Sequence, residues 1–310
     1  MGTPEFAAVI LSRLLADEYS VVAVVSQPDK PSGRKMKLLP TPVKMVAEAQ
    51  EIPVLQPVKV RTAEFEEELR SYAPDLIVTA AYGRILPASI LEIPAHGCLN
   101  VHGSLLPDYR GSAPVQRAIL RGDTKTGVTV MKMDEGMDTG EMVRRAEVPI
   151  PGDMDAVELM SILAERGAQL LSDVLPSYLA GEIVLEEQDD ARATHAPMIE
   201  RAQGLIDWSA SAAVIHNQIR GLAIWPGTHT FLNGSRVKMY TSSLEVPKEL
   251  LTMGDETPGT IIKASGGDLV VACGVGSLLR ILSLQPESGR RMDARDCAHN
   301  YRVGDRFVGC

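Results

Sequence analysis

The order of apolar segments along this 310-residue chain predicts an α/β protein with two domains. Residues 1–183 alternate short apolar runs with helical patterns, which is typical of a mainly parallel sheet covered by helices on both faces. After residue 204 the pattern changes to short β-like runs separated by turn signals such as Asn233-Gly234. We therefore expect a Rossmann-like domain at 1–183, a polar linker at 184–204 and a smaller β-barrel, OB-like domain at 205–310.

Hydrophobic periodicity locates the individual elements of both domains. In the first domain it predicts helices at 5–17, 42–51, 62–72, 114–122 and 155–180, and strands at 20–26, 53–56, 75–81, 98–102, 127–133 and 142–150. In the second domain it predicts a helix at 209–222, followed by strands at 228–232, 236–243, 259–264, 268–274 and 278–284. We expect Trp208 and Trp225 to anchor the core of this second domain.

The start of the chain is unusual for a doubly wound domain, which normally opens with a central apolar strand and a tight turn. Met1-Gly2-Thr3-Pro4 already reads as that turn, and a helical pattern follows at once. We expect that a first strand of roughly six residues is missing from this sequence, for instance through a mistaken start codon. The sheet would then have a gap or an exposed edge near its centre.

Composition narrows the possible partners and the cellular compartment. The net charge of −9 argues against a generally basic nucleic-acid binder, but Asp29–Lys44 carries five basic residues and one acidic residue. That segment suits either a polyanionic partner or a plain solvated loop. The four cysteines form no CxxC pair and no metal-ligand spacing, which predicts a reduced, cytoplasmic protein without a metal. No apolar run approaches the roughly 20 residues of a membrane span.

The stretch Leu99–Gly111, LNVHGSLLPDYRG, contains the strongest chemical signal. Asn100 and His102 are two residues apart on a strand, so both side chains project from the same face. Gly103 then ends the strand, at the carboxyl edge where open α/β sheets keep their ligand crevices. An amide donor and an imidazole directed at one point suggest chemistry on a carbonyl group. Asp138, in the loop MDEGMDTG, is a third candidate, although Asp and Gly are ordinary turn residues.

The run Leu99–Ile119 resembles the signature of the folate-dependent formyltransferase family. Further similarity extends over nearly the whole chain: Gly2–Ala7, Ser26–Lys44, Ala80–Pro87, Thr126–Gly140, Leu205–Ser209, Trp225–Thr228 and Leu284–Met292. Within the family the resemblance is to those members that formylate methionine carried on initiator tRNA. It implies an enzyme that takes the formyl group from 10-formyltetrahydrofolate, uses no metal and acts as a monomer.

The resemblance also implies a role for each candidate residue. Asn100, His102 and Asp138 match the family's catalytic residues. Asn100 and His102 would donate hydrogen bonds to the oxyanion of a tetrahedral intermediate, while Asp138 would orient the imidazole and accept the amine's proton. The residues implied to line the folate site are Tyr82, Gly83, Ile85, Leu86, Pro87, Ser104, Leu105, Leu106 and Pro107. Arg34, Lys35 and Lys37 would contact the tRNA acceptor stem through salt-dependent charge interactions.

Two other functions remain open at this level. A transferase acting on an amino-sugar nucleotide would share the three catalytic residues, but it would not need the basic loop. A non-catalytic tRNA-binding protein with a disabled first domain would bind without turnover, and it would not need all three residues. The sequence also departs from the family pattern at Lys35, where a glycine is usual, and at Met198, where a lysine is usual. Both departures concern the binding of tRNA rather than the reaction.

Overall fold

The computed structural model describes residues 1–32, 37–250 and 256–309, which form two compact units. The first unit comprises Met1–Pro114, Lys125–Pro149 and Met160–Pro197, and the second comprises Val115–Thr124, Ile150–Leu159 and Met198–Cys310. Three cysteines of the described residues, Cys98, Cys273 and Cys297, are buried as free thiols. Within this part of the chain, every helix is too short or too polar to span a lipid bilayer.

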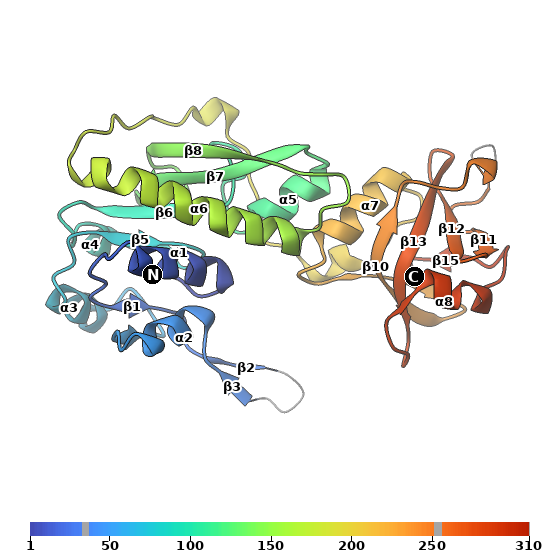
Figure 1. Cartoon of the computed structure of the whole chain (residues 1–310), viewed down its shortest axis with the longest axis horizontal. Coiled ribbons are helices and arrows are strands. Elements are labelled where there is room, and N and C mark those ends of the chain that lie inside the picture. Colours follow the sequence, from blue (N-terminus) through green and yellow to red (C-terminus); the bar gives the residue numbers. More distant parts are fainter. Residues whose placement is uncertain (33–36, 251–255, 310) are drawn as a thin grey trace. The chain divides into compact units, whose positions relative to one another are not determined.

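The first unit contains a four-stranded sheet in the order β5 (Ile77–Thr79), β6 (Cys98–His102), β7 (Lys125–Lys132) and β8 (Met142–Pro149) (Figure 1). β5 and β6 are parallel, as expected, whereas β6, β7 and β8 are mutually antiparallel. The prediction of a mainly parallel sheet is therefore correct only for part of this unit. β7 and β8 are joined by a short loop over residues 133–141, and so short a connection permits only an antiparallel pair.

A second, separate pair of parallel strands lies in the same unit, formed by β1 (Val24–Val25) and β4 (Val54–Leu55). The strand expected at 20–26 is thus reduced to two residues. Its pairing gives the reason: β4 pairs only with Val24 and Val25, the Gly2 amide bonds to Val25 O from the other side, and residues 19–23 border a cavity. The basic segment forms a small antiparallel hairpin of β2 (Lys30–Ser32) and β3 (Lys37–Leu39).

The helices of the first unit are α1 (Glu5–Ala16), α2 (Pro42–Ala49), α3 (Ala63–Ser71), α4 (Ala88–Leu91) and most of α6 (Ala156–Leu179), while α5 (Pro114–Arg121) belongs almost entirely to the second unit. All of them lie close to predicted helices except the short α4, which was not predicted. The hydroxyls of Thr41 and Thr62 cap the first turns of α2 and α3.

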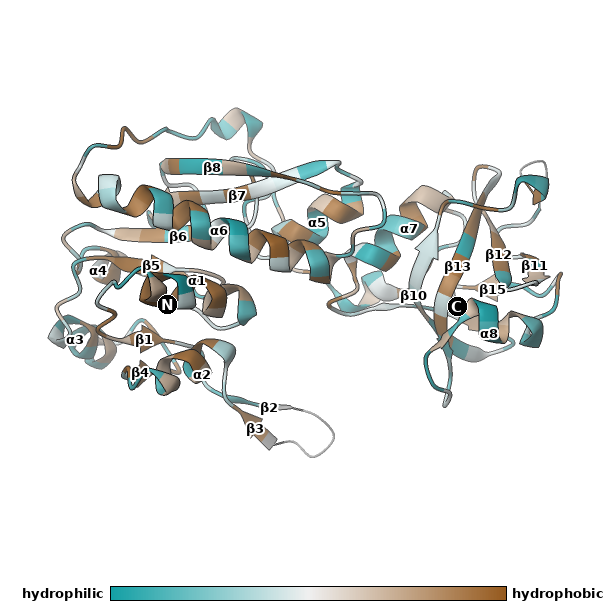
Figure 2. Ribbon diagram, viewed as in Figure 1, coloured by the Kyte–Doolittle hydropathy of each residue, from teal (hydrophilic) through white to brown (hydrophobic). Residues whose placement is uncertain are grey.

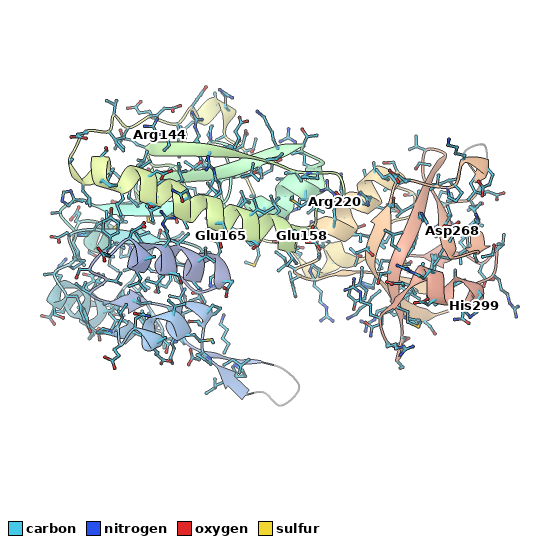
Figure 3. All side chains as sticks on the ribbon, viewed as in Figure 1. Arg144, Glu158, Glu165, Arg220, Asp268 and His299 are labelled. Atoms are coloured by element: carbon cyan, nitrogen blue, oxygen red, sulfur yellow. The ribbon has the colours of Figure 1, made fainter. Side chains whose placement is uncertain are left out.

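The long helix α6 shows how the first unit is packed. Its residues alternate between apolar and polar stretches (Figure 2), with Leu163 fully buried. Glu165 lies on the exposed side, as does Arg144 of β8 (Figure 3). A Cβ at Gly167 would lie 2.7 Å from Val101 of β6, so the missing side chain lets the helix approach the sheet closely.

The second unit is a curled antiparallel sheet with short helices. Its sheet order is β11 (Ile261–Ser265), β12 (Asp268–Cys273), β13 (Ser277–Pro286), β10 (Ser235–Ser243), β9 (Thr228–Leu232) and β15 (Phe307–Val308), with β14 (Met292–Asp293) beside β13. Thr260 bridges to Arg306, so the two ends of this sheet approach each other. The helices are α7 (Ala212–Gly221) and α8 (Ala294–Cys297), and 3-10 turns occur at Asp190–Arg192, Arg201–Gly204, Lys248–Leu250 and Ala298–Asn300 across the chain.

The two tryptophans of this unit differ in environment. Trp208 is buried, stacks on Phe307 with ring centroids 5.7 Å apart, and donates its indole N–H to Thr230 Oγ1 at 2.9 Å. The prediction that it anchors the core is confirmed. The same prediction is wrong for Trp225, which is 49% exposed because it lies in the loop between α7 and β9.

Candidate active site

Asn100 and His102 occupy the carboxyl end of β6, between β5 and β7. In register, Asn100 is opposite Thr79 of β5 and Met131 of β7. The alternation of a strand places the side chains of Asn100 and His102 on the same face, as the spacing predicts. β6 is the central strand here, so its position is fixed from both sides by main-chain hydrogen bonds.

The carboxamide of Asn100 is oriented by Thr79. The Thr79 hydroxyl lies 2.9 Å from Asn100 Oδ1, and a hydroxyl can donate to that oxygen. This bond leaves the amide nitrogen, Nδ2, as the group that faces the carboxylate of Asp138, with Nδ2 to Oδ1 at 3.4 Å. An oriented N–H donor is therefore available at the mouth of the site.

The imidazole of His102 is buried and is held by the main chain. Its Nε2 lies 3.0 Å from the carbonyl oxygen of Tyr109. A carbonyl only accepts, so Nε2 carries the hydrogen in this contact. The other ring nitrogen, Nδ1, faces Asp138 Oδ2 at 3.6 Å. In the neutral ring, Nδ1 is thus a base directed at a carboxylate, and only the protonated ring can donate from it.

Asp138 is fixed by its backbone and by two neighbouring segments. Its φ of 57° is in the left-handed region, where Asp is one of the few residues tolerated. The amide of Gly111 donates to Asp138 Oδ2 at 2.9 Å. Gln188 donates from Nε2 to the carbonyls of Asp138 and Gly140, at 2.9 and 2.7 Å. The carboxylate keeps part of its surface exposed, and its approach to the other two side chains is imposed by this scaffold.

The structure therefore brings Asn100, His102 and Asp138 together, although Asp138 is 36 residues beyond His102 in the chain. The arrangement offers one oriented N–H donor, one imidazole nitrogen and one carboxylate around a common point. Such a set can donate to a developing oxyanion and can accept a proton from an attacking amine.

The turn after β6 is stabilised internally. Ser104 Oγ donates to the carbonyl of Asp108 at 2.5 Å, and Thr129 bonds both the Ser104 carbonyl and the Leu106 amide. Ser104 and Leu106 are fully buried, and the Leu106–Pro107 peptide is cis. Leu105 packs against Gly127 of β7, where a Cβ would collide with it. These side chains shape the turn, and any contact from Ser104 or Leu106 to a ligand would come through the main chain.

The Tyr82–Pro87 loop follows β5 and contains both buried side chains, which pack in the core, and exposed groups. Tyr82 and Leu86 are buried in the apolar core of the first unit, and burial raises the pKa of the Tyr82 hydroxyl to about 12. Gly83 has a φ of 73°, and Ile85 is 48% exposed. Ile85, together with backbone groups of the loop, is what this segment can present to a ligand.

The basic candidates fall on or beside the β2–β3 hairpin. Arg34 and Lys35 lie outside the described residues, and the backbone of Lys37 begins β3. In the described part of the hairpin, Leu38 and Leu39 are both more than half exposed. Met198, which stands where the family pattern has a lysine, is 72% exposed.

Three supporting residues were not singled out from the sequence: Thr79, Gly111 and Gln188. Thr79 carries a usable signal, since it is the polar residue of the apolar strand predicted at 75–81, apart from Asp75 at its start. Gly111 and Gln188 carry none, because their contacts depend on how residues 107–113 and 186–196 pair, through bonds such as Ala196 N to Arg110 O at 2.8 Å. No cluster of three potential metal ligands occurs among His, Cys, Asp and Glu residues of the described ranges.

Comparison with known proteins connects this geometry to a family. Residues 1–175 match the family described as Formyl transferase, and residues 198–302 match Formyl transferase, C-terminal domain. The methionyl-tRNA formyltransferase of Geobacter sulfurreducens is 45% identical over 98% of this chain and 93% of its own length. The corresponding proteins of Trichlorobacter lovleyi and Desulfotalea psychrophila are 49% and 48% identical, over 95% and 99% of this chain and 90% and 94% of theirs.

Solved structures share the fold at low sequence identity. A sugar 3N-formyl transferase, solved in the presence of dTDP and 5-N-formyl-THF, has a TM-score of 0.66 at 18% identity, covering 90% of this chain and 94% of that one. An N-formyltransferase from Helicobacter canadensis has a TM-score of 0.65 at 19% identity, covering 90% and 96%. The sequence relatives are decisive: with both domain matches and 45–49% identity along nearly its whole length, the chain belongs to the methionyl-tRNA formyltransferase family.

Proposed function

We propose that this chain transfers the formyl group of 10-formyltetrahydrofolate to the α-amine of methionine on initiator tRNA, and that Asn100, His102 and Asp138 act on the reacting atoms. The observation that carries the proposal is the convergence of these three side chains at the carboxyl end of β6. The oriented N–H donor of Asn100 fits a formyl oxygen, and the facing imidazole and carboxylate fit a protonated amine that must lose a proton.

The chemistry assigns each group one task. The neutral amine attacks the formyl carbon, a C–N bond forms, and the carbonyl electron pair moves onto oxygen. Asn100 Nδ2 donates to that oxyanion, and loss of one such donor typically lowers turnover by about 10²–10³-fold. Asp138 accepts the proton that the amine nitrogen loses, directly or through His102 Nδ1. The oxyanion's electron pair then re-forms the carbonyl, the bond from the formyl carbon to the folate nitrogen breaks, and that nitrogen takes up the proton that Asp138 had accepted, directly or back through His102 Nδ1.

The folate site is proposed from Ser104–Pro107 and Tyr82–Pro87, the loops that follow β6 and β5. Both leave parallel strands at the same edge of the sheet, next to Thr79 and Asn100. Ile85 and Leu105 supply apolar side chains, while Gly83 and the buried residues of both loops supply main-chain groups. We place the cofactor's ring system here because it needs an apolar surface beside polar backbone atoms.

The tRNA site is proposed from the basic hairpin and the second domain. Lys37, with Arg34 and Lys35, would neutralise phosphates of the acceptor stem. We keep the domain assignment of 1–183 for formyl transfer, 184–204 as linker and 205–310 as an OB-like tRNA-binding domain. We further propose that the enzyme is a monomer and works in the cytoplasm, where initiator tRNA is charged.

An acceptor comparison tests this function. The purified chain is given 10-formyltetrahydrofolate and, in parallel, methionine-charged initiator tRNA, methionine-charged elongator tRNA, free methionine or an amino-sugar nucleotide. We expect formylation of the charged initiator tRNA alone. Formylation of the amino-sugar nucleotide would support the sugar transferase alternative. The two solved formyltransferase structures described above share the fold of this chain at 18–19% identity. Binding of tRNA without any turnover would support the non-catalytic alternative.

A further inference from the structure

Residues 194–196, in the stretch predicted as a linker, pair with the chain that follows the turn after β6. Arg110 N donates to Thr194 O at 2.8 Å, and Ala196 N donates to Arg110 O at 2.8 Å. Both segments belong to the first unit. These bonds hold Thr194 beside the loop whose main chain contacts the imidazole of His102.

Tyr109, in that loop, has an unusual backbone conformation. Its φ of 62° lies in the left-handed region, where a bulky aromatic residue is rare. Thr194 holds both peptide groups that flank this residue. Its hydroxyl oxygen accepts from the Tyr109 amide at 2.9 Å, and its carbonyl oxygen accepts from the Arg110 amide at 2.8 Å. The first of these peptide groups is also held at its other end, since Ser104 Oγ donates to the Asp108 carbonyl.

The second peptide group contains the carbonyl that His102 contacts. His102 Nε2 lies 3.0 Å from Tyr109 O, and the N–H at the other end of the same peptide is the Arg110 N–H that donates to Thr194. A rotation of this peptide group would therefore break both bonds at once. Thr194 thus determines, through the two peptide groups around Tyr109, the direction in which this carbonyl points.

The direction of the carbonyl decides which ring nitrogen of His102 carries the hydrogen. A neutral imidazole has one N–H, and the hydrogen bond made by one nitrogen sets the protonation of the other. With the Tyr109 carbonyl in place, Nε2 donates and Nδ1 keeps its lone pair towards Asp138, whose Oδ2 is 3.6 Å away. If the carbonyl turned away, Nε2 would lose its acceptor, and the hydrogen would be more stable on Nδ1 beside the carboxylate. Nδ1 could then no longer accept a proton.

We propose that Thr194 is a positioning residue that selects the Nε2–H tautomer of His102 by fixing the Tyr109 carbonyl. This inference rests on the proposed function, because the tautomer affects turnover only if Nδ1 takes part in moving the amine's proton. It assigns a task in the reaction to a residue that lies 92 positions beyond His102 in the chain. The segment 184–204, predicted only to join the two domains, then contributes to the site.

The tautomer can be measured by ¹⁵N NMR on the full chain labelled at its histidines. Ring nitrogens with and without a hydrogen differ clearly in chemical shift, and the spectrum of His102→Ala identifies the His102 signals among those of the six histidines. Spectra are recorded above the pH at which these signals cease to titrate, so that the ring is neutral. We expect Nε2–H in the wild type and in Thr194→Ser. In Thr194→Val, which keeps the side-chain shape without the hydroxyl, about half of the ring population or more should carry the hydrogen on Nδ1.

Single-turnover formylation of methionine-charged initiator tRNA at saturating folate is the second readout. The rate of Thr194→Val should fall about tenfold with folate binding unchanged, because Nδ1 accepts no proton in much of the population. Thr194→Ser should return the rate to within about threefold of the wild type.

Thr62→Val is the matched control. The Thr62 hydroxyl also accepts from a main-chain amide of the first unit, that of Phe65, but it caps helix α3. This variant should lower the melting temperature and leave both the tautomer of His102 and the rate unchanged.

Any of four results would overturn the proposal: Nδ1–H in the wild type, Nε2–H alone in Thr194→Val, a rate that Thr194→Ser does not restore, or equal rate losses in Thr194→Val and Thr62→Val. The first needs no variant, so it applies even if Thr194→Val does not fold. The NMR measurement uses neither folate nor tRNA, so a failure there leaves the proposed function standing. A wild-type chain that does not formylate charged initiator tRNA would refute the proposed function and not the tautomer.

Discussion

At the residue scale, the tautomer of His102 determines how the site can work. Its Nε2–H is engaged by the carbonyl of Tyr109, so the ring orientation is set by the main chain rather than by Asp138. The sequence predicted that Asp138 would orient the ring. In the structure Asp138 Oδ2 lies 3.6 Å from the other ring nitrogen, Nδ1, which is too far for a hydrogen bond that would orient the ring. His102 can therefore donate to an oxyanion only after it has been protonated.

Thr79 is a positioning residue whose effect can be measured. Thr79→Val keeps the shape of the side chain but removes the hydroxyl that holds Asn100 Oδ1. We expect kcat to fall about tenfold, which corresponds to the roughly 1–1.5 kcal/mol of one hydrogen bond, with KM for the folate nearly unchanged. Thr79→Ser should restore kcat because it restores the hydroxyl. If kcat falls in both variants, or if only KM and the free energy of unfolding change, Thr79 serves only to pack the strand.

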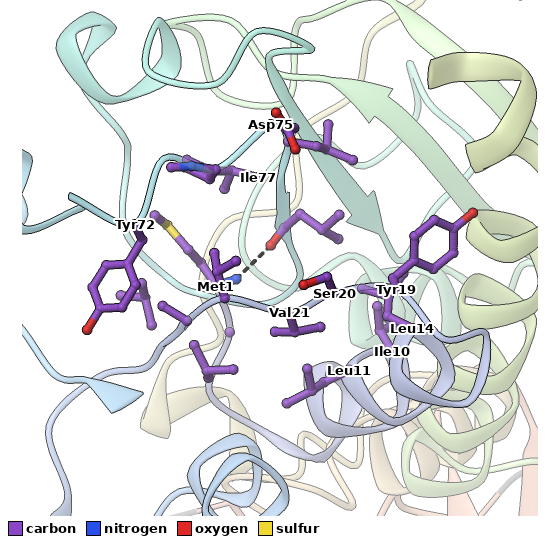
Figure 4. A pocket seen from close by; sticks show the side chains of 18 of the residues that line it. Met1, Ile10, Leu11, Leu14, Tyr19, Ser20, Val21, Tyr72, Asp75 and Ile77 are labelled. Atoms are coloured by element: carbon purple, nitrogen blue, oxygen red, sulfur yellow. Dashed lines mark hydrogen bonds between the residues drawn. The ribbon is translucent and has the colours of Figure 1, made fainter. Parts of the chain in front are cut away.

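The buried amino group of Met1 (Figure 4) predicts a pH dependence of stability. Burial lowers its pKa to about 6, against about 8 in an unfolded chain. Between these values the unfolded state binds more protons, so the free energy of unfolding should rise as the pH is raised from 6 to 8. The two-unit difference corresponds to about 2–3 kcal/mol. Denaturant unfolding across this range measures it, on a preparation whose mass confirms that Met1 is present.

The control for this experiment is the same chain with an acetylated α-amine. His216 also has a lowered pKa because it is buried, so part of the pH dependence should remain after acetylation. The difference between the two chains isolates the amine. If acetylation leaves the slope between pH 6 and 8 unchanged, the amino group is not desolvated in the folded protein.

At the element scale, the loop that carries Asp138 is held in place by residues 186–196. Gln188 bonds two carbonyls of this loop and accepts from the Nε of buried Arg110, whose Nη2 also contacts Asp190 at 2.7 Å. Gly111 permits the close approach, since a Cβ there would lie 2.7 Å from the Ala196 carbonyl. The segment therefore supports the site instead of merely connecting domains.

Gln188→Leu tests this support. It removes three hydrogen bonds and leaves the Arg110 guanidinium with one partner fewer, so we expect a loss of about 1–3 kcal/mol in the free energy of unfolding and a lower kcat. Gln169→Leu removes a half-buried amide of α6 that bonds Arg13 of α1 and Asp173 of α6; it is the matched control and should change kcat little. Similar kcat values for the two variants would show that the Asp138 loop keeps its position without Gln188.

Sequence periodicity predicted most elements well because their burial patterns are local. Strand β6 and helices such as α1 and α6 lie within about two residues of their predicted limits. The strand at 20–26 was predicted too long because only Val24 and Val25 pair with β4, and a local sequence pattern does not reveal which residues will pair. Asn100 and His102 could be predicted from spacing, whereas the tautomer of His102 and the role of Gln188 could not, since both depend on loops folding back from distant positions.

At the scale of the whole molecule, the candidate site belongs to the four-stranded sheet of the first unit, while β1 and β4 form a separate two-stranded sheet. The site is built on β5, β6 and the loop that joins β7 to β8, so its strands all belong to the larger sheet. Its geometry therefore depends on the pairing of β6 with β5 and β7 rather than on the pairing of β1 with β4.

The most direct test of the catalytic assignment is single-turnover formylation of methionine-charged initiator tRNA, at saturating folate, by the wild-type chain and the variants Asn100→Ala, His102→Ala and Asp138→Asn. His299→Ala, an exposed histidine of the second unit, is the control. We predict rates lowered by about 10²-fold or more in each of the three variants, with folate binding retained, and a wild-type rate in the control. Rates within a few-fold of wild type in Asn100→Ala or His102→Ala would contradict the assignment of these residues to the reacting atoms.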